Sequence, residues 1–126
     1  MPRQIITTAD APSSPLYSQG VRAGANIFVS GVVGIDPGTN SLVDATIQAQ
    51  TRQALKNCEA ILQAGGATFD DVVEVGVLLA RSSDFDGLNE EYARWFTAAS
   101  PARYVARLGV DLPGVLVSIR MTAFVG

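Results

Sequence analysis

The segment 72–80, VVEVGVLLA, limits the possible folds more than any other part of this chain. Its β-branched residues predict a strand, and side chains along a strand alternate between two faces. One alternating set is Val73, Val75, Val77 and Leu79, and the other is Val72, Glu74, Gly76, Leu78 and Ala80. Both sets are largely apolar, so we expect both faces of this strand to be buried.

Two segments with helical periodicity flank this strand. Asp44 is positioned to cap a helix that runs to about Ala64, where Gly65-Gly66 ends it, and Asp84 is positioned to cap a second helix. The apolar positions of the first are Ile47, Ala54, Cys58, Ile61 and Leu62, and those of the second are Phe85, Leu88, Tyr92, Trp95 and Phe96. Each set predicts a helix with one buried face.

The other expected strands complete a small α+β domain. They are residues 3–7, a hairpin of 21–23 with 26–33, and two final strands, 102–110 and 115–124, joined around Pro113-Gly114. We therefore predict one domain over residues 1–126, a two-layer sandwich of one mixed sheet with both helices on one face. In the last strand, Val117, Ile119, Met121 and Ala123 would meet the helices, and Leu116, Ser118, Arg120 and Thr122 would face away.

Because helices cover only one face, the second apolar face of segment 72–80 predicts contact with another subunit. The alternative is a half-exposed strand that tolerates apolar residues. Charged residues make up only 17% of the chain, below the share of about 25% that is usual for soluble domains, and this also favours a hidden surface.

Composition excludes several classes of partner and chemistry. The net charge of −3 argues against nucleic-acid binding, and no apolar run is long enough to span a bilayer. The start of the chain lacks the apolar core of a signal peptide, so we expect a cytoplasmic protein. The chain has no histidine and one cysteine, which excludes Ser-His and Cys-His pairs and leaves no metal site. We expect no cofactor, and the chemistry must use Arg, Tyr, Ser, Asn, acids, backbone amides and water.

Four stretches carry a resemblance to a known family: PLYSQG at 15–20, IFVSG at 27–31, NEEYARWF at 89–96 and PAR at 101–103. Together they make the chain similar to the YjgF/RidA reactive-intermediate deaminases, once described as L-PSP endoribonucleases. The resemblance covers nearly the whole chain in the same order. It implies a chorismate-mutase-like homotrimer, whose three sheets line a central barrel and whose clefts between subunits bind small carboxylates. In the deaminating members, an arginine pairs with the substrate carboxylate while water hydrolyses an enamine or imine to a keto acid and ammonia.

Arg103 is the main candidate site residue, because a guanidinium presents a planar donor fork that fits a carboxylate. Without the family resemblance, a solvated strand arginine is the better explanation of Arg103, and the match to the family's Pro-Ala-Arg motif reverses this preference. Tyr17 offers a hydroxyl to substrate or water, or else packs over a subunit edge.

Ser30-Gly31 and Asn89 are the further candidates for substrate binding. Gly31 lets a ligand approach the backbone closely, and its N–H can donate to a carboxylate oxygen or to a developing negative charge. A simple bulge or bend explains a glycine there as well. The motif match implies that Asn89 borders the cleft. The alternative is that Asn89 is a solvated residue of the second helix.

The chain departs from the family pattern at two places. The deaminases end with a strand close to Val-Glu-Ile-Glu-Ala, where the first glutamate is thought to hold the attacking water, and here Ser118 and Arg120 replace the two glutamates. Ser118 can orient water but is a poor general base. Val105 stands where the family often has Cys or a small residue. If the last two strands pair, Ser118 would lie near the cleft that Arg103 lines.

The leading hypothesis is hydrolytic deamination of small enamine or imine acids of the 2-aminoacrylate type, weak or altered in substrate, for example toward an amino-dienoic acid. Arg103, Tyr17 and Ser118 would be its catalytic residues. The alternative is a trimer that binds a small carboxylate metabolite without chemistry. A ribonuclease is disfavoured by the acidic charge and the lack of histidine.

Overall fold

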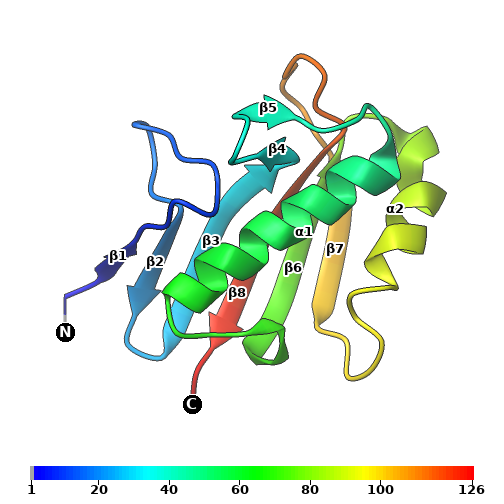
Figure 1. Ribbon diagram of the computed structural model, residues 1–126. Coiled ribbons are helices and arrows are strands. Elements are labelled where there is room, and N and C mark those ends of the chain that lie inside the picture. The colour runs from blue at the N-terminus through cyan, green and yellow to red at the C-terminus, as the bar shows by residue number, and fades with distance from the viewer. Residues whose placement is uncertain (1) are drawn as a thin grey trace.

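The computed structural model describes residues 2–126 and contains a six-stranded sheet with two helices on one face (Figure 1). The strands of this sheet are β1 (Gln4–Ile6), β2 (Gly20–Ala23), β3 (Asn26–Val33), β6 (Val72–Leu79), β7 (Ala102–Arg107) and β8 (Val117–Phe124). A small hairpin is formed by β4 (Ile35–Asp36) and β5 (Ser41–Leu42). The helices are α1 (Ile47–Ala64) and α2 (Phe85–Tyr92), with 3-10 turns η1 (Phe69–Asp71) and η2 (Ser82–Asp84). The predicted α+β class, with two helices and a mixed sheet, is confirmed.

The order of strands across the sheet is β1-β2-β3-β8-β6-β7. Only β6 and β7 run parallel, and the connection between them passes through α2, as a parallel crossover requires. The last two strands of the chain therefore do not pair with each other, because β6 lies between β7 and β8. Ser118 was expected to lie near Arg103 only if these two strands paired. Because they do not pair, Ser118 and Arg103 are not brought together within one chain.

Both helix starts differ in detail from their predicted caps. Thr46, not Asp44, is the N-cap of α1, and its hydroxyl accepts a hydrogen bond from the Ala49 amide at 3.1 Å. Asp84 occupies the N-cap position of α2, but its carboxylate pairs with Arg81 at 3.0 Å instead of capping the helix. At Asp84 the neighbouring Arg81 guanidinium competes for the carboxylate, a choice that spacing alone does not reveal.

The first helix ends as predicted, and the second ends earlier. The Gly65 amide donates to the Ile61 and Leu62 carbonyls, and Gly66 follows with φ of 92°. The second helix stops at Tyr92, so Trp95 and Phe96 lie in the turns after it, although both still pack against the core. None of the helices within residues 2–126 is long and apolar enough to cross a membrane.

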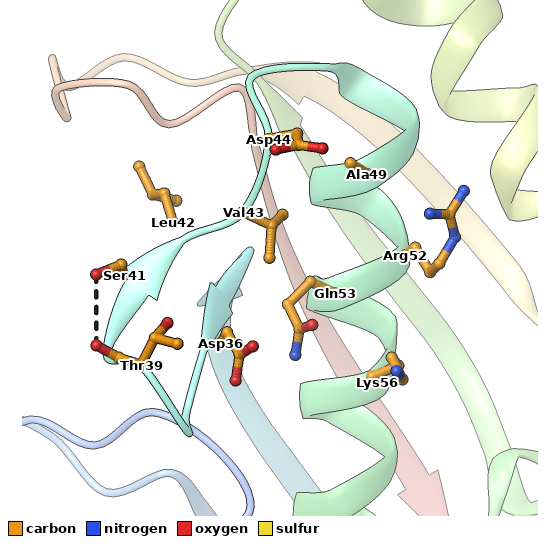
Figure 2. A pocket seen from close by; sticks show the side chains of 10 residues that line it. All are labelled: Asp36, Thr39, Ser41, Leu42, Val43, Asp44, Ala49, Arg52, Gln53 and Lys56. Atoms are coloured by element: carbon orange, nitrogen blue, oxygen red, sulfur yellow. Dashed lines mark hydrogen bonds between the residues drawn. The ribbon is translucent and has the colours of Figure 1, made fainter.

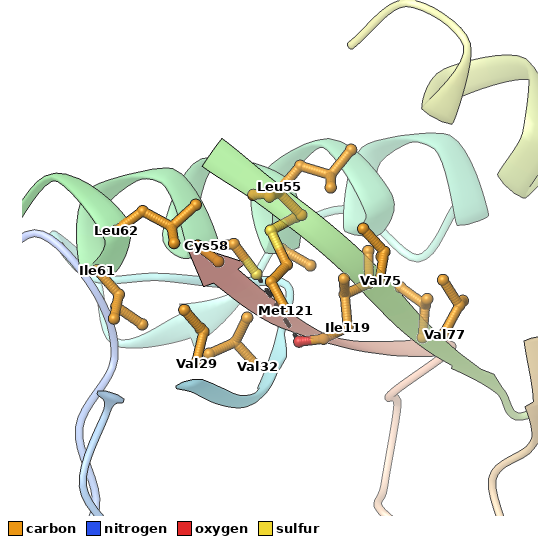
Figure 3. Packing of buried hydrophobic residues seen from close by; sticks show 14 of the residues in the cluster. Val29, Val32, Leu55, Cys58, Ile61, Leu62, Val75, Val77, Ile119 and Met121 are labelled. Atoms are coloured by element: carbon orange, nitrogen blue, oxygen red, sulfur yellow. Dashed lines mark hydrogen bonds between the residues drawn. The ribbon is translucent and has the colours of Figure 1, made fainter. Parts of the chain in front are cut away.

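The core fills the space between α1 and one face of the sheet (Figure 3). The predicted stripe of α1 is fully or nearly fully buried, and so are the four core positions predicted on β8. Cys58 is a buried free thiol, and its burial raises its pKa above the usual range. These positions were predictable because residues that recur at the helical or strand period lie on one face of their helix or strand, and that face is the buried one.

The face of β6 that points away from the helices was predicted to be buried, and it is buried only in part. An irregularity between Val72 and Glu74 shifts the alternation, so Val72 joins the core and Val73 is 49% exposed. Gly76 is buried because Tyr104 lies directly over it: a Cβ there would sit 2.4 Å from the tyrosine hydroxyl. The chain itself covers part of this face, and Leu78 remains half-buried.

Candidate functional site

Arg103 lies on the edge strand β7, on the side that faces α2. One Nη1–H donates to Asn89 Oδ1 at 2.7 Å, and the guanidinium carbon lies 4.8 Å from the centroid of the Tyr92 ring. Among residues 2–126, no carboxylate forms an ion pair with Arg103. A guanidinium stacked on a ring and held by one amide keeps most of its donor fork free for an anion.

The support under Arg103 comes from α2, where Asn89 and Tyr92 are one turn apart. Tyr92 also stacks on Phe96, with ring centroids 4.7 Å apart. Burial raises the pKa of Tyr92, although the Arg103 charge acts in the opposite direction. The ring therefore stays neutral and presents an electron-rich face to the guanidinium. The sequence placed Tyr92 on the apolar face of its helix and gave it no link to Arg103.

The second helix is fixed in turn by Glu91, whose side chain is almost fully buried. Its carboxylate accepts from Arg52 Nη2 at 3.0 Å and from Trp95 Nε1 at 2.9 Å, and Arg94 lies 3.7 Å away. Burial would raise the pKa of Glu91, but the hydrogen bonds from Trp95 and Arg52 and the two positive charges outweigh it, so the pKa is lowered. Glu91 thus ties α2 to α1 as an ionised group; it lies within the NEEYARWF stretch, but nothing in the sequence suggested a role of its own for it.

A second group of predicted residues lies around β3. Ser30 and Gly31 occupy an irregularity in the β3–β8 pairing between Val29 and Val32, which is the bulge considered as the alternative explanation. The Ser30 hydroxyl donates to the Ser18 carbonyl at 2.6 Å. A Cβ on Gly31 would lie 3.0 Å from Ser118 Oγ, so glycine lets Ser118 approach this strand closely.

Gln19 holds the loop that carries Tyr17, a role the sequence did not suggest. Its buried side-chain amide donates to the carbonyls of Thr8, Ala11 and Pro12 and accepts from the Thr8 amide. Its backbone carbonyl accepts from the Ser30 amide at 3.0 Å. Tyr17 itself is 56% exposed, in a hollow of about 440 Å³ lined by Ile5, Thr7 and residues 13–19.

The two groups lie apart within one chain. The register pairs Arg103 with Val75, a core residue, whereas Ser118 pairs with Leu78, on the opposite face of β6. Three strand spacings, about 14 Å, separate β3 from β7. Within one chain, Arg103 and Asn89 therefore lie together in one place, and Ser30, Gly31 and Ser118, with the loop that carries Tyr17, lie in another.

A further hollow of about 430 Å³ lies between the β4–β5 hairpin and α1 (Figure 2). Its lining carries both signs of charge, with Asp36 and Asp44 before the helix and Arg52 and Lys56 on α1. It contains none of the predicted site residues. The Arg52 charge is already paired with Glu91, so this hollow offers little net attraction for an anion.

Comparison with known proteins settles the family. A sequence model described as Endoribonuclease L-PSP matches residues 8–125. The chain belongs to the YjgF/RidA family. A RutC family protein of Pyrococcus horikoshii is 39% identical over 124 residues, which cover 97% of this chain and 98% of that protein.

Two further members of the YjgF/RidA family carry informative names. The human 2-iminobutanoate/2-iminopropanoate deaminase is 38% identical over 125 residues, covering 98% of this chain and 91% of the human protein. The crystal structure of E. coli TdcF with bound serine superimposes with a TM-score of 0.89 at 30% identity, covering 96% of this chain and 98% of that one. The family thus includes imine deaminases and a member that holds a small carboxylate.

Proposed function

We propose that this YjgF/RidA protein hydrolyses small 2-imino or enamine acids to 2-keto acids and ammonia. The observation that carries the proposal is the Arg103 guanidinium, which is oriented by Asn89 and Tyr92 and has no carboxylate partner within residues 2–126. A substrate carboxylate fits its free donors as a two-pronged ion pair. The names of the relatives give the reaction class.

The proposed reaction needs little from the protein beyond positioning. Water adds to the C=N carbon, a proton reaches the nitrogen, the C–N bond breaks, and ammonia leaves as the carbonyl forms. Such imines already hydrolyse in water, so orientation and electrostatic stabilisation supply the remaining acceleration. Tyr17, the Gly31 amide and Ser118 are the groups we assign to the reacting end.

This assignment requires a site built from two subunits, because the two groups of residues lie apart in one chain. A homotrimer with clefts at its subunit boundaries would bring Arg103 of one copy to Tyr17 and Ser118 of the next. The single cysteine is free and buried, which suits a reducing compartment, and we propose a cytoplasmic location.

The decisive measurement is pyruvate release from 2-aminoacrylate generated enzymatically. The wild-type protein should speed it, and Arg103→Ala should lose about 1.5–3 kcal/mol of binding, roughly a 10- to 150-fold rise in KM or in the Kd for pyruvate. Arg3→Ala, which removes an exposed arginine outside both groups of site residues, is the control and should change 2-aminoacrylate turnover much less. If Arg103→Ala binds and turns over like the wild type, the assignment is wrong.

A non-catalytic role is the second candidate, and one observation favours it. Ser118 has no ionisable group at the position where the family resemblance implies a glutamate that holds the attacking water. A protein that binds keto acids through Arg103 without accelerating imine hydrolysis would fit this role. The family description also names an endoribonuclease, but the net charge of −3 and the lack of histidine argue against that activity here.

A further inference from the structure

An apolar groove lies next to Arg103, between β7 and the start of α2. It has a volume of about 410 Å³. We call it the β7–α2 groove, and its lining residues are Leu79, Ser82, Phe85, Val105, Ala106 and Arg107. Pockets that hold small ligands are typically about 300–1,000 Å³ and mostly apolar. Phe85 lines the groove with a side chain that is 44% exposed.

The groove and the Arg103 contact are consecutive parts of one surface. On β7 the side chains of Arg103, Val105 and Arg107 point to the same side, because strand side chains repeat every two residues. Successive members of this row are about 6–7 Å apart. On the facing helix, Phe85 and Asn89 are four residues apart and share one face. Figure 1 shows α2 lying alongside β7.

A ligand held by its carboxylate at Arg103 therefore has the groove within reach of its side chain. The carboxylate end would contact Arg103 and Asn89, and the next 6–7 Å along the strand leads to Val105 and Phe85. A methyl group leaves this space empty, whereas a branched or aromatic side chain fills it. Removing such apolar surface from water favours the larger ligand.

We propose that the β7–α2 groove is the side-chain subsite of the enzyme, and that its preferred substrates are 2-imino acids with an apolar side chain of at least four carbons. This inference rests on the proposed deaminase function and narrows its substrate class. The expected preference over 2-iminopropanoate is about ten-fold or more in kcat/KM, because each added methylene in an apolar pocket is worth about 10-fold or more.

The test compares imines made in place from alanine, leucine and phenylalanine by an L-amino acid oxidase, with residual imine trapped by semicarbazide. The readout is the ratio of kcat/KM for the leucine-derived imine to that for the alanine-derived imine. Val105→Trp and Ser82→Trp fill the groove from its two walls and should lower this ratio about ten-fold. Val110→Ala removes an exposed apolar side chain outside the groove and should leave the ratio unchanged.

A binding measurement makes the test independent of turnover. Calorimetry should give a lower Kd for 4-methyl-2-oxopentanoate than for pyruvate, and the two tryptophan variants should remove the difference. Equal affinities and equal rates for the small and large ligands would overturn the subsite while leaving the deaminase function intact. A preference for a dicarboxylic imine, lost in Arg107→Ala, would also overturn the apolar assignment.

The remaining outcomes separate the two proposals. If the tryptophan variants change the oligomeric state in sedimentation and the wild type shows no size preference, a neighbouring subunit occupies the groove and the subsite is wrong. If no imine is turned over, the deaminase function is wrong, and the keto-acid affinities then decide the subsite alone.

Discussion

At the scale of single residues, the departure at Ser118 has the sharpest chemical consequence. Its hydroxyl lies against Gly31 and has no accessible charge near neutral pH. Arg120, two residues later on the same face, already contacts Glu74 at 3.5 Å. A carboxylate introduced at position 118 would therefore meet an arginine that has another partner, which limits how far its pKa is lowered.

We expect Ser118→Glu to raise the rate of 2-aminoacrylate hydrolysis, because a carboxylate can hold the attacking water and move its proton. General acid–base assistance is typically worth about 10²–10⁴-fold. Pyruvate release by the wild type, Ser118→Glu and Ser118→Glu/Arg120→Gln measures it. The double variant removes the remaining positive charge without placing a second acid beside Glu74. Unchanged rates in both variants would mean that water is not held at this position.

At the scale of elements, α2 is the part of the fold on which the site depends most. It is short, with only eight residues, and it carries both Asn89 and Tyr92. Its position is set by the Glu91 contacts to Arg52 and Trp95 and by the stacking of Tyr92 on Phe96. An eight-residue helix has little stability of its own, so these tertiary contacts determine where Arg103 is supported.

Glu91→Gln should lower the free energy of unfolding at pH 7 by about 1–2 kcal/mol, a value reduced because Arg52 and Arg94 are partly exposed. The folded-state pKa of Glu91 lies below its unfolded value, so its contribution is present above the unfolded pKa. It is lost as the pH falls through the folded pKa. Urea unfolding at several pH values should show the variant and wild type converging in acid. Glu90→Gln, on the exposed side of the same helix, should show no such difference.

At the scale of the whole molecule, one sheet face has no helix over it. The register places Ile5, Phe28, Tyr104 and Phe124 on this face, and each is between 43% and 53% exposed. An exposed apolar surface of this kind is typical of a subunit interface. The separation of the two groups of site residues leads independently to the same expectation.

Sedimentation equilibrium at micromolar concentration should give the mass of a trimer, and a stable monomer would contradict the predicted assembly. A mixing experiment tests whether the site is shared between copies. At substrate concentrations well below KM, Arg103→Ala and Tyr17→Ala should each have strongly reduced activity, and subunits exchanged between them should regain wild-type activity in roughly one quarter of their sites. Absence of recovery in proven mixed trimers would place Arg103 and Tyr17 in separate functions.

The sequence by itself determined the two helices, the main strands and the family, because these depend on local period and on motifs, whereas it missed the β4–β5 hairpin and the early end of α2. Helical spacing identified the buried stripe that includes Ala54 and Cys58, and strand alternation identified Ile119 and Met121. The Pro-Ala-Arg motif is the basis on which Arg103 is proposed as a site residue. Each of these signals lies within a few residues along the chain, where geometry is fixed by the backbone.

Only the tertiary structure decided which residues meet across the sheet. The placement of β6 between β7 and β8 separates Arg103 from Ser118, and the bulge at Val72 reverses part of the expected alternation. The support of Arg103 by Tyr92, and of α2 by Glu91, joins residues that no spacing rule connects. Strand order and long-range ion pairs follow from packing of the whole chain, since many arrangements satisfy the same local pattern.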